Sequence, residues 1–176
     1  METKLKTTIY LALLVLFNVQ VYSQENDKMK KNEISIDIGN LINAYPEVSY
    51  YHLLSDESSI GVSAKFSIDN KNEYQFLFIP NYRIFFGKKK AAGFFIEGNV
   101  AFFSQYEQKS TFFFGTINAT NNKKIGVGVG FAIGSKFLSK SGFTGEIFTG
   151  TGRNFINTNK IDRYYPRIGI SIGKRF

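Results

Sequence analysis

The chain alternates between apolar and polar residues over much of its length, with a period of two residues. Because successive side chains of a β-strand point to opposite faces, this period predicts strands. Eight segments show it: residues 33–39, 47–54, 59–68, 74–86, 93–103, 124–136, 142–153 and 164–176. No segment after residue 23 has a convincing helical period. We therefore expect an all-β fold of eight strands.

The connections between these segments differ in length in a regular way. Short turns follow the second, fourth and sixth strands, at residues 55–58, 87–92 and 139–141. The other connections are mostly longer and more polar: residues 40–46, 69–73, 104–123 and 154–163. In an up-and-down antiparallel meander, this alternation places every long loop at one end. Transmembrane β-barrels have this layout, with short periplasmic turns and longer outer loops.

The two faces of the expected strands differ in composition. One carries Ile, Val, Phe and Tyr almost throughout, and the other carries Gly, Ala, Ser and Asn with isolated charges. The small residues between Gly126 and Gly134 suit a crowded lumen, since eight strands leave an interior just wide enough for side chains. We therefore predict an eight-stranded antiparallel up-and-down transmembrane β-barrel with its apolar face outside. A soluble ligand-binding barrel would require the opposite assignment of faces.

The first 23 residues have the features of a secretory signal peptide. Lys4 and Lys6 precede an apolar run, and Val21 and Ser23 occupy the −3 and −1 positions of a cleavage site before Gln24. The run is short for a membrane anchor, which needs about 20 apolar residues. We predict a signal peptide at residues 1–23, a flexible lead-in at 24–32 and a barrel at 33–176.

Composition narrows the expected partners. Removing residues 1–23 takes away Lys4, Lys6 and Glu2, and leaves 153 residues with 20 basic and 13 acidic side chains. The chain has no Cys, so an exported domain cannot depend on disulfides. The mean hydropathy of −0.14 argues against a helical membrane protein but not against a β-barrel, because only alternate residues face lipid. Export makes nucleic acid an improbable partner, and leaves lipid or lipopolysaccharide phosphates as the expected anions.

The features described so far resemble those of small eight-stranded outer-membrane β-barrels, the OmpX-like proteins and the OmpA transmembrane domain. The resemblance covers roughly residues 33–176 and rests on the strand count, inward Glu97 and Glu146, the GTGRNF stretch at 150–155 and the terminal Phe176. It implies an outer-membrane location and a monomer. It also implies that the barrel-assembly machinery reads the last strand during insertion, through Tyr164, Ile168, Ile170, Ile172 and Phe176.

Charged residues on the expected lumen face are the first candidates for a functional site. Buried carboxylates must be paired, because an isolated buried charge is very costly. We expect an ion-pair network that fills the lumen and fixes the strand register; a proton path, an ion path or a gate is the alternative. The predicted members are Asp37, Lys65, Arg83, Glu97, Glu146, Arg153 and Arg167, and Arg175 also falls on this face.

Few residues suggest catalysis or cofactor binding. His52 is the single histidine, so a histidine-based metal cluster is impossible, and we predict neither catalytic residues nor a metal site. Ser49 and Ser55 are three residues from His52, which puts them on the opposite face of an extended strand. The GVGVGFAIG stretch lacks the third glycine and the following helix of a dinucleotide-binding motif, so no cofactor is expected.

Two connections could contact partners. The longest contains Phe112, Phe113 and Phe114, which either belong to an interfacial aromatic girdle or form an exposed outer-loop surface. Lys88, Lys89 and Lys90 form a basic run in a short turn, which is expected to be a solvated turn; contact with anionic headgroups is the alternative.

These observations predict a non-enzymatic integral outer-membrane barrel with a packed polar lumen and a structural or outer-loop interaction role. The alternatives are a lipid A-modifying barrel enzyme and a narrow channel.

Overall fold

The computed structural model of the chain describes residues 30–42, 45–68, 74–110 and 117–176. The expected signal peptide at residues 1–23 lies outside the described residues, as do Phe112, Phe113 and Phe114. Within the described residues, no helix is long and apolar enough to cross a membrane.

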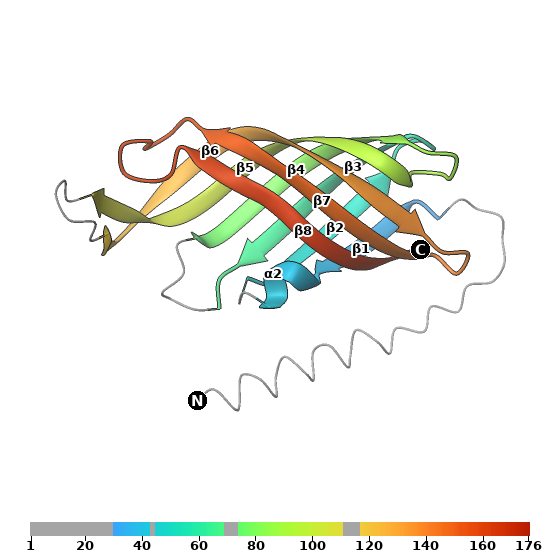
Figure 1. Cartoon of the computed structure of the whole chain (residues 1–176), viewed down its shortest axis with the longest axis horizontal. Helices are drawn as coiled ribbons and strands as arrows, with labels where there is room; N and C mark the ends of the chain where they lie inside the picture. Colours follow the sequence, from blue (N-terminus) through green and yellow to red (C-terminus); the bar gives the residue numbers. More distant parts are fainter. Residues whose placement is uncertain (1–29, 43–44, 69–73, 111–116) are drawn as a thin grey trace, which may run out of the picture.

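Eight antiparallel strands form a closed barrel (Figure 1). Each strand pairs with the next along the chain and the last pairs with the first, so the order is an uninterrupted meander. The fold class predicted from the sequence is confirmed. The strands are β1 Asn32–Asp37, β2 Glu47–Leu53, β3 Ser58–Phe66, β4 Tyr74–Phe86, β5 Gly93–Ser110, β6 Ile117–Leu138, β7 Phe143–Asn154 and β8 Tyr164–Arg175.

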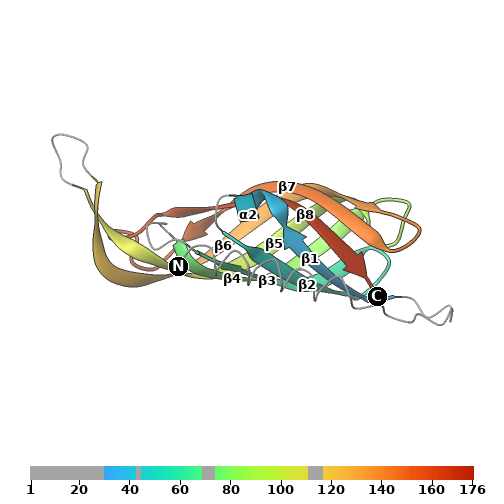
Figure 2. The same ribbon diagram turned by 90° about the horizontal axis from the view of Figure 1, so that it is seen from below.

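The strands are strongly staggered around the barrel. Glu33 pairs with Tyr51 of β2, and stepping from each residue to its partner on the next strand leads around the barrel to Tyr165 of β8. On its other side, Glu33 pairs directly with a different residue of β8, Arg175. Closing a sheet into a barrel requires such an offset, here ten residues, and tilts the strands against the barrel axis. The tilt is visible in both views (Figures 1 and 2).

The barrel has two different ends. The β2–β3, β4–β5 and β6–β7 connections lie at one end together with the C-terminus, on the right of Figure 1; we call this the turn end. The β7–β8 connection lies at the opposite end, together with Ser110 at the end of β5 and Ile117 at the start of β6; we call this the loop end.

The hairpin of β5 and β6 is much longer than predicted. Most of the loop expected at residues 104–123 is strand, because β5 continues to Ser110 and β6 begins at Ile117. Pairing of β5 with β4 reaches only Gln105, and pairing of β6 with β7 reaches only Gly128. The outer part of the hairpin is therefore a two-stranded ribbon that projects beyond the loop end and curves away from the barrel (Figure 2).

A short helix replaces the predicted end of the first strand. Residues Ile38–Ile42 form α2, so the assignment of Ile38 and Gly39 to a strand is wrong. The Asp37 side chain accepts a hydrogen bond from the Asn40 backbone N–H at 2.7 Å, as a residue capping a helix N-terminus does. The helix lies beside β8, where Asn40 Nδ2 donates to Ile168 O at 3.2 Å. It occupies the edge of β8 that β1 is too short to cover.

Side chains alternate between the inside and the outside of the barrel. In β2 and β8 buried and exposed residues alternate along nearly the whole strand. Every strand exposes large apolar side chains, among them Ile34, Val48, Ile60, Tyr82, Ile96, Phe131, Ile147 and Ile170. The buried side chains include most of the charged residues of the strands. The molecule is therefore apolar outside and ionic inside.

Candidate functional site, a chain of ion pairs inside the barrel

Charged side chains inside the barrel form one continuous chain of ion pairs. The members alternate in sign, and the two charged groups of each successive pair lie within 3.3 Å of each other. All eight strands contribute, so the chain cross-links the whole barrel. From the loop end to the turn end the order is Lys65, Glu47, Arg167, Glu97, Arg83, Glu146, Lys136, Glu33 and Arg175. We refer to these nine residues as the ion-pair chain.

Arg83 occupies the centre of the ion-pair chain and is fully buried. Its Nε lies 2.8 Å from Glu97 Oε2 and its Nη1 lies 2.8 Å from Glu146 Oε2. The guanidinium carbon is 4.2 Å from the ring centre of Tyr51 and 4.4 Å from that of Phe95. Two carboxylates and two aromatic faces thus compensate the loss of water around this cation.

Arg167 links the centre to the loop end. It donates to Glu97 Oε1 from Nε at 2.9 Å, to Glu47 from Nη1 and to Ser63 Oγ from Nη2 at 3.1 Å. These partners lie on β5, β2 and β3, so the side chain of a β8 residue crosses the lumen. Lys65 completes this end at 3.3 Å from the second oxygen of Glu47.

Lys136, Glu33 and Arg175 form the turn-end part of the chain. Lys136 Nζ lies 2.8 Å from both Glu146 Oε1 and Glu33 Oε1. Arg175 Nη2 lies 3.1 Å from Glu33 Oε2 and also donates to Ala91 O at 2.8 Å. Through Arg175 the last strand is joined both to the first strand and to the β4–β5 turn.

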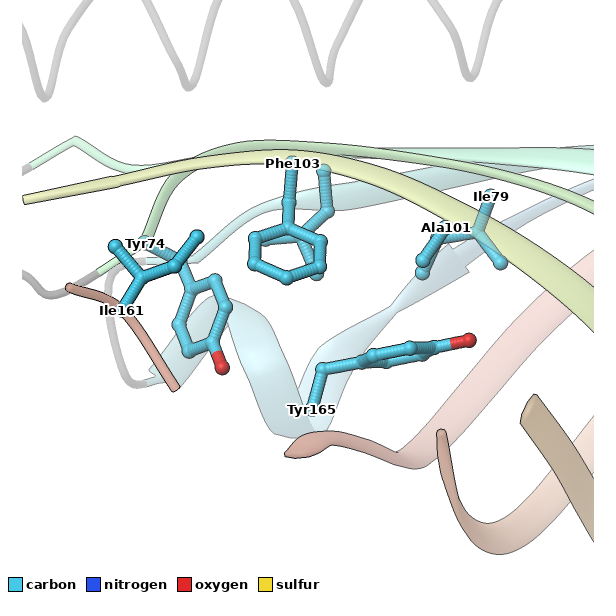
Figure 3. Close-up of a cluster of buried hydrophobic side chains, with 7 residues drawn as sticks. Tyr74, Ile79, Ala101, Phe103, Ile161 and Tyr165 are labelled. Carbon is cyan, nitrogen blue, oxygen red and sulfur yellow. The ribbon is translucent and has the colours of Figure 1, made fainter. Parts of the chain in front are cut away.

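Apolar clusters close the lumen on both sides of the ionic centre. The loop-end cluster packs the Phe103 ring between Tyr74 and Tyr165, with ring centres 5.6 and 5.8 Å apart (Figure 3). Ile161, from the β7–β8 connection, packs into the same cluster and is buried. The turn-end cluster contains Leu53, Phe85, Ala91, Phe95 and Phe148. The sequence reading, which expected mainly small residues inside, missed these large side chains.

The glycines of β6 and β7 make room for these rings. A Cβ added at Gly126 would collide with the Phe103 ring, and one added at Gly152 would collide with the Tyr165 ring. A Cβ added at Gly134 would likewise collide with the Phe95 ring. The glycine-rich stretch that superficially resembles a nucleotide-binding motif is therefore a set of lumen positions that face aromatic side chains.

The structure brings together five of the seven residues predicted for the lumen network: Lys65, Arg83, Glu97, Glu146 and Arg167. Asp37 is buried but forms no ion pair with any described residue; its carboxylate accepts from Asn40 N and, at 3.4 Å, from Ser171 Oγ. Arg153 is exposed on the outer face, so its assignment to the lumen is wrong. The physical reason is the strand period, because Arg153 shares its face with outward Ile147 and not with inward Glu146.

Sequence reasoning missed Glu33, Glu47 and Lys136. Each stands at an end of a predicted segment, two residues from a small residue of the same strand face: Ser35, Ser49 and Gly134. Continuing the two-residue period by one step would have found all three.

The terminal-strand residues and the candidate catalytic histidine lie on the outside. Tyr164, Ile168, Ile170, Ile172 and Phe176 are exposed. His52 is also exposed, with Nδ1 2.9 Å from Asn32 Oδ1. Ser49 points into the lumen, 2.7 Å from Ser63 Oγ, and exposed Ser55 bonds Ser58 at 2.8 Å, so neither serine lies beside His52. In the part of the chain that the structure describes, no three acidic or histidine side chains are grouped to hold a metal ion.

The closed meander, the staggered register and the ionic interior define the class of eight-stranded antiparallel β-barrels. Among solved structures, the fold is similar to the N-terminal β-barrel domain of Pseudomonas aeruginosa OprF, with a TM-score of 0.52 and 12% sequence identity. The match covers 84% of this chain and 98% of that domain. No protein-family model matches the chain, and no curated protein matches it. The resemblance to eight-stranded outer-membrane barrels is confirmed at the level of the fold.

Proposed function

We propose that the mature chain is a non-enzymatic integral outer-membrane β-barrel with a packed lumen, and that it acts as a structural protein or through its loop end. The observation that carries this proposal is the inverted distribution of polarity: large apolar side chains cover the outside of all eight strands, and ion pairs fill the inside. Soluble monomers rarely expose an apolar patch larger than roughly 300–600 Å². A lipid bilayer is the environment in which a continuous apolar belt is stable.

The closed barrel satisfies the second requirement of a membrane span. Every backbone polar group within the hydrocarbon must find a partner in the protein, and a closed antiparallel barrel provides one. The place where β1 is too short is covered by α2, whose Asn40 side chain binds Ile168 O. Pro166, which has no N–H to leave unpaired, lies in the same uncovered half of β8.

The interior favours a structural or interaction role over transport. The ion-pair chain runs through the lumen, and apolar clusters lie on either side of its centre. The surface offered to partners is then the loop end, where the β5–β6 ribbon projects beyond the rim. Outer-leaflet lipid and lipopolysaccharide surround the barrel in this proposal, and the barrel-assembly machinery inserts it through its terminal strand.

Heat-modifiable electrophoresis of the membrane fraction tests the location. Expressed with its leader in a bacterial host with an outer membrane, the protein is expected in the outer-membrane fraction, and the unboiled form is expected to migrate differently from the boiled form. The variant Ile96→Arg places a charge on the apolar belt and should lower the folded membrane fraction. Glu57→Arg, at an exposed turn position, should not. Recovery of folded protein from the soluble periplasmic fraction would overturn the proposal.

A further inference from the structure

Arg153 is an arginine on the outer surface of the barrel, within its apolar face. Near the loop end of β7 it pairs with Val129 of β6 and with Tyr164 of β8. The side chains of these two neighbours are 55% and 63% exposed, and Phe155 beyond Arg153 is 62% exposed. The cation is therefore surrounded by outward-facing apolar and aromatic groups.

Arg153 has no carboxylate partner among the described residues, unlike the buried arginines Arg83 and Arg167, each of which has two. Its guanidinium carbon lies 5.9 Å from the ring centre of Phe155. Asp162, the acidic residue of the β7–β8 connection, is directed elsewhere: its carboxylate accepts from Gln105 Nε2 at 2.9 Å and from Tyr74 OH at 3.4 Å.

A second exposed arginine lies next to Arg153 on the neighbouring chain segment. Arg163 O accepts from Asn154 N at 2.8 Å, so Arg163 lies opposite Asn154, the residue that follows Arg153. In the described part of the chain Arg163 also has no ion-pair partner. Two exposed arginines on adjacent chain segments at the loop end thus have no ion-pair partner among the described residues.

The connection that carries these residues is held in place by side-chain hydrogen bonds. Asn154 Nδ2 donates to Ile156 O at 2.8 Å and to Asp162 O at 2.9 Å. Asn157 Nδ2 donates to Ile125 O at 2.9 Å, which ties the connection to β6. Exposed Phe155, Ile156 and Ile125 therefore form a fixed apolar surface beside the arginines.

We propose that Arg153 and Arg163 bind the phosphate group of a membrane lipid, whose acyl chains run toward the middle of the barrel along exposed Phe131 and Ile147. The proposal rests on the proposed membrane location, because only there does the apolar belt bring lipid headgroups to this level. A guanidinium binds phosphate with two parallel hydrogen bonds, and a lipid phosphate is the anion available at the border of a hydrocarbon layer. The cation and the apolar surface together match a phosphorylated headgroup with attached chains.

Lys174 provides a matched control at the opposite end of the barrel. Its ammonium lies 4.0 Å from the ring centre of Phe143 and donates to Ser141 O at 2.7 Å. It is a cation beside an exposed aromatic ring, as Arg153 is, but it already has a hydrogen-bond acceptor in the protein.

Native mass spectrometry of the folded protein tests the proposal. The protein is released from detergent micelles that contain either dioleoyl phosphatidic acid or dioleoyl phosphatidylcholine, and the lipid-bound fraction is measured. The wild type should retain phosphatidic acid preferentially, and Arg153→Gln and Arg163→Gln should each weaken its binding about fivefold. Arg153→Lys should retain part of the binding because it keeps the charge. Lys174→Gln should leave binding at the wild-type level.

Unchanged binding in the double variant Arg153→Gln/Arg163→Gln, or an equal loss in Lys174→Gln, would overturn the lipid site. The boiled-versus-unboiled mobility of the same samples separates this outcome from a failure of the membrane location. A wild type that inserts but binds lipid independently of Arg153 refutes only the site. A wild type that does not insert refutes the membrane proposal and the site with it.

Discussion

Each glutamate of the ion-pair chain holds two cations, and this decides how the chain responds to substitution. Glu146 contacts Arg83 and Lys136 at 2.8 Å each. A neutral residue at this position leaves Arg83 paired with Glu97 alone and Lys136 paired with Glu33 alone. The loss is greater than that of a surface pair, because water cannot replace the missing charge.

We therefore expect Glu146→Gln to destabilise the barrel by about 3–5 kcal/mol, as the removal of one partner from a buried pair does. Urea unfolding of the protein folded in lipid vesicles, followed by the gel shift, measures the change. Glu57→Gln, at an exposed turn position, is the control and should leave the unfolding midpoint in place. Equal midpoints for Glu146→Gln and the wild type would contradict the role of the chain in stability.

We expect an added methyl group to destabilise the barrel at a glycine that faces the lumen but not at one on the outer face. A methyl group at Gly152 would occupy the position of the Tyr165 ring, whereas at Gly98, on the outer face of β5, it would meet no atom within 4 Å. Gly152→Ala should destabilise the barrel by about 1–3 kcal/mol through overpacking. Gly98→Ala should be neutral or slightly stabilising in the same urea series. A Gly152→Ala protein as stable as Gly98→Ala would show that the aromatic cluster can move aside.

At the residue scale the strand period predicts which face a side chain takes, and the errors come from not applying it to the end of each strand. Glu33, Glu47 and Lys136 obey the period that placed Asp37, Lys65 and Arg83 inside. The assignment of Arg153 to the lumen contradicts this period, which places Arg153 on the outer face with Ile147. The pairing itself was beyond prediction, since the stagger of the barrel determines which lumen charges meet.

Among the elements, the β5–β6 hairpin shows that a strand can lack the two-residue alternation of apolar and polar side chains. Alternation marks a strand whose two faces see different surroundings. Beyond Gln105 and its partner Lys124, the two strands of the ribbon pair only with each other, so their residues need not alternate. The sequence 104–123 therefore resembles a polar loop although most of it is hydrogen-bonded strand. Helix α2 escaped prediction for a related reason, because five residues are too few to show a helical period.

We expect the outer ribbon to be dispensable for barrel formation. Tyr106 pairs with Lys123, so an Asn-Gly turn that replaces residues 107–122 can join them as a two-residue hairpin. This variant should keep the gel shift and the wild-type unfolding midpoint, since the one ion pair it removes among the described residues is the partly exposed Glu107–Lys124 pair at 3.8 Å.

A longer deletion in the same hairpin provides the control for that experiment. Phe102 pairs with Val127, so the same turn in place of residues 103–126 preserves the hairpin register but removes Phe103 from the loop-end cluster. This variant should unfold at lower urea. A large loss of stability from the shorter cut alone would mean that the ribbon packs on the barrel.

Seen as a whole, the lumen is filled by three overlapping layers: an aromatic cluster at the loop end, the ion-pair chain, which runs from the loop end to the turn end, and an apolar cluster toward the turn end. The fold was predictable because hydrophobic period, loop lengths and terminal strand all indicate the same barrel. The layers were not, because each is assembled from residues that are distant in the sequence, such as Tyr74 and Tyr165, or Glu33 and Lys136.

This filling predicts the conductance of the protein. Arg83 and Arg167 are each held by two carboxylates and an aromatic ring, so an ion crossing the barrel would have to displace both arginines and the Phe103–Tyr165 cluster. We expect wild-type protein in a planar bilayer to give no sustained current steps. Phe103→Ala removes one layer and should also remain closed, because the ion-pair chain lies beneath it. Sustained steps from the wild type would contradict the packed lumen, and steps only from Phe103→Ala would show that the aromatic cluster alone keeps the barrel closed.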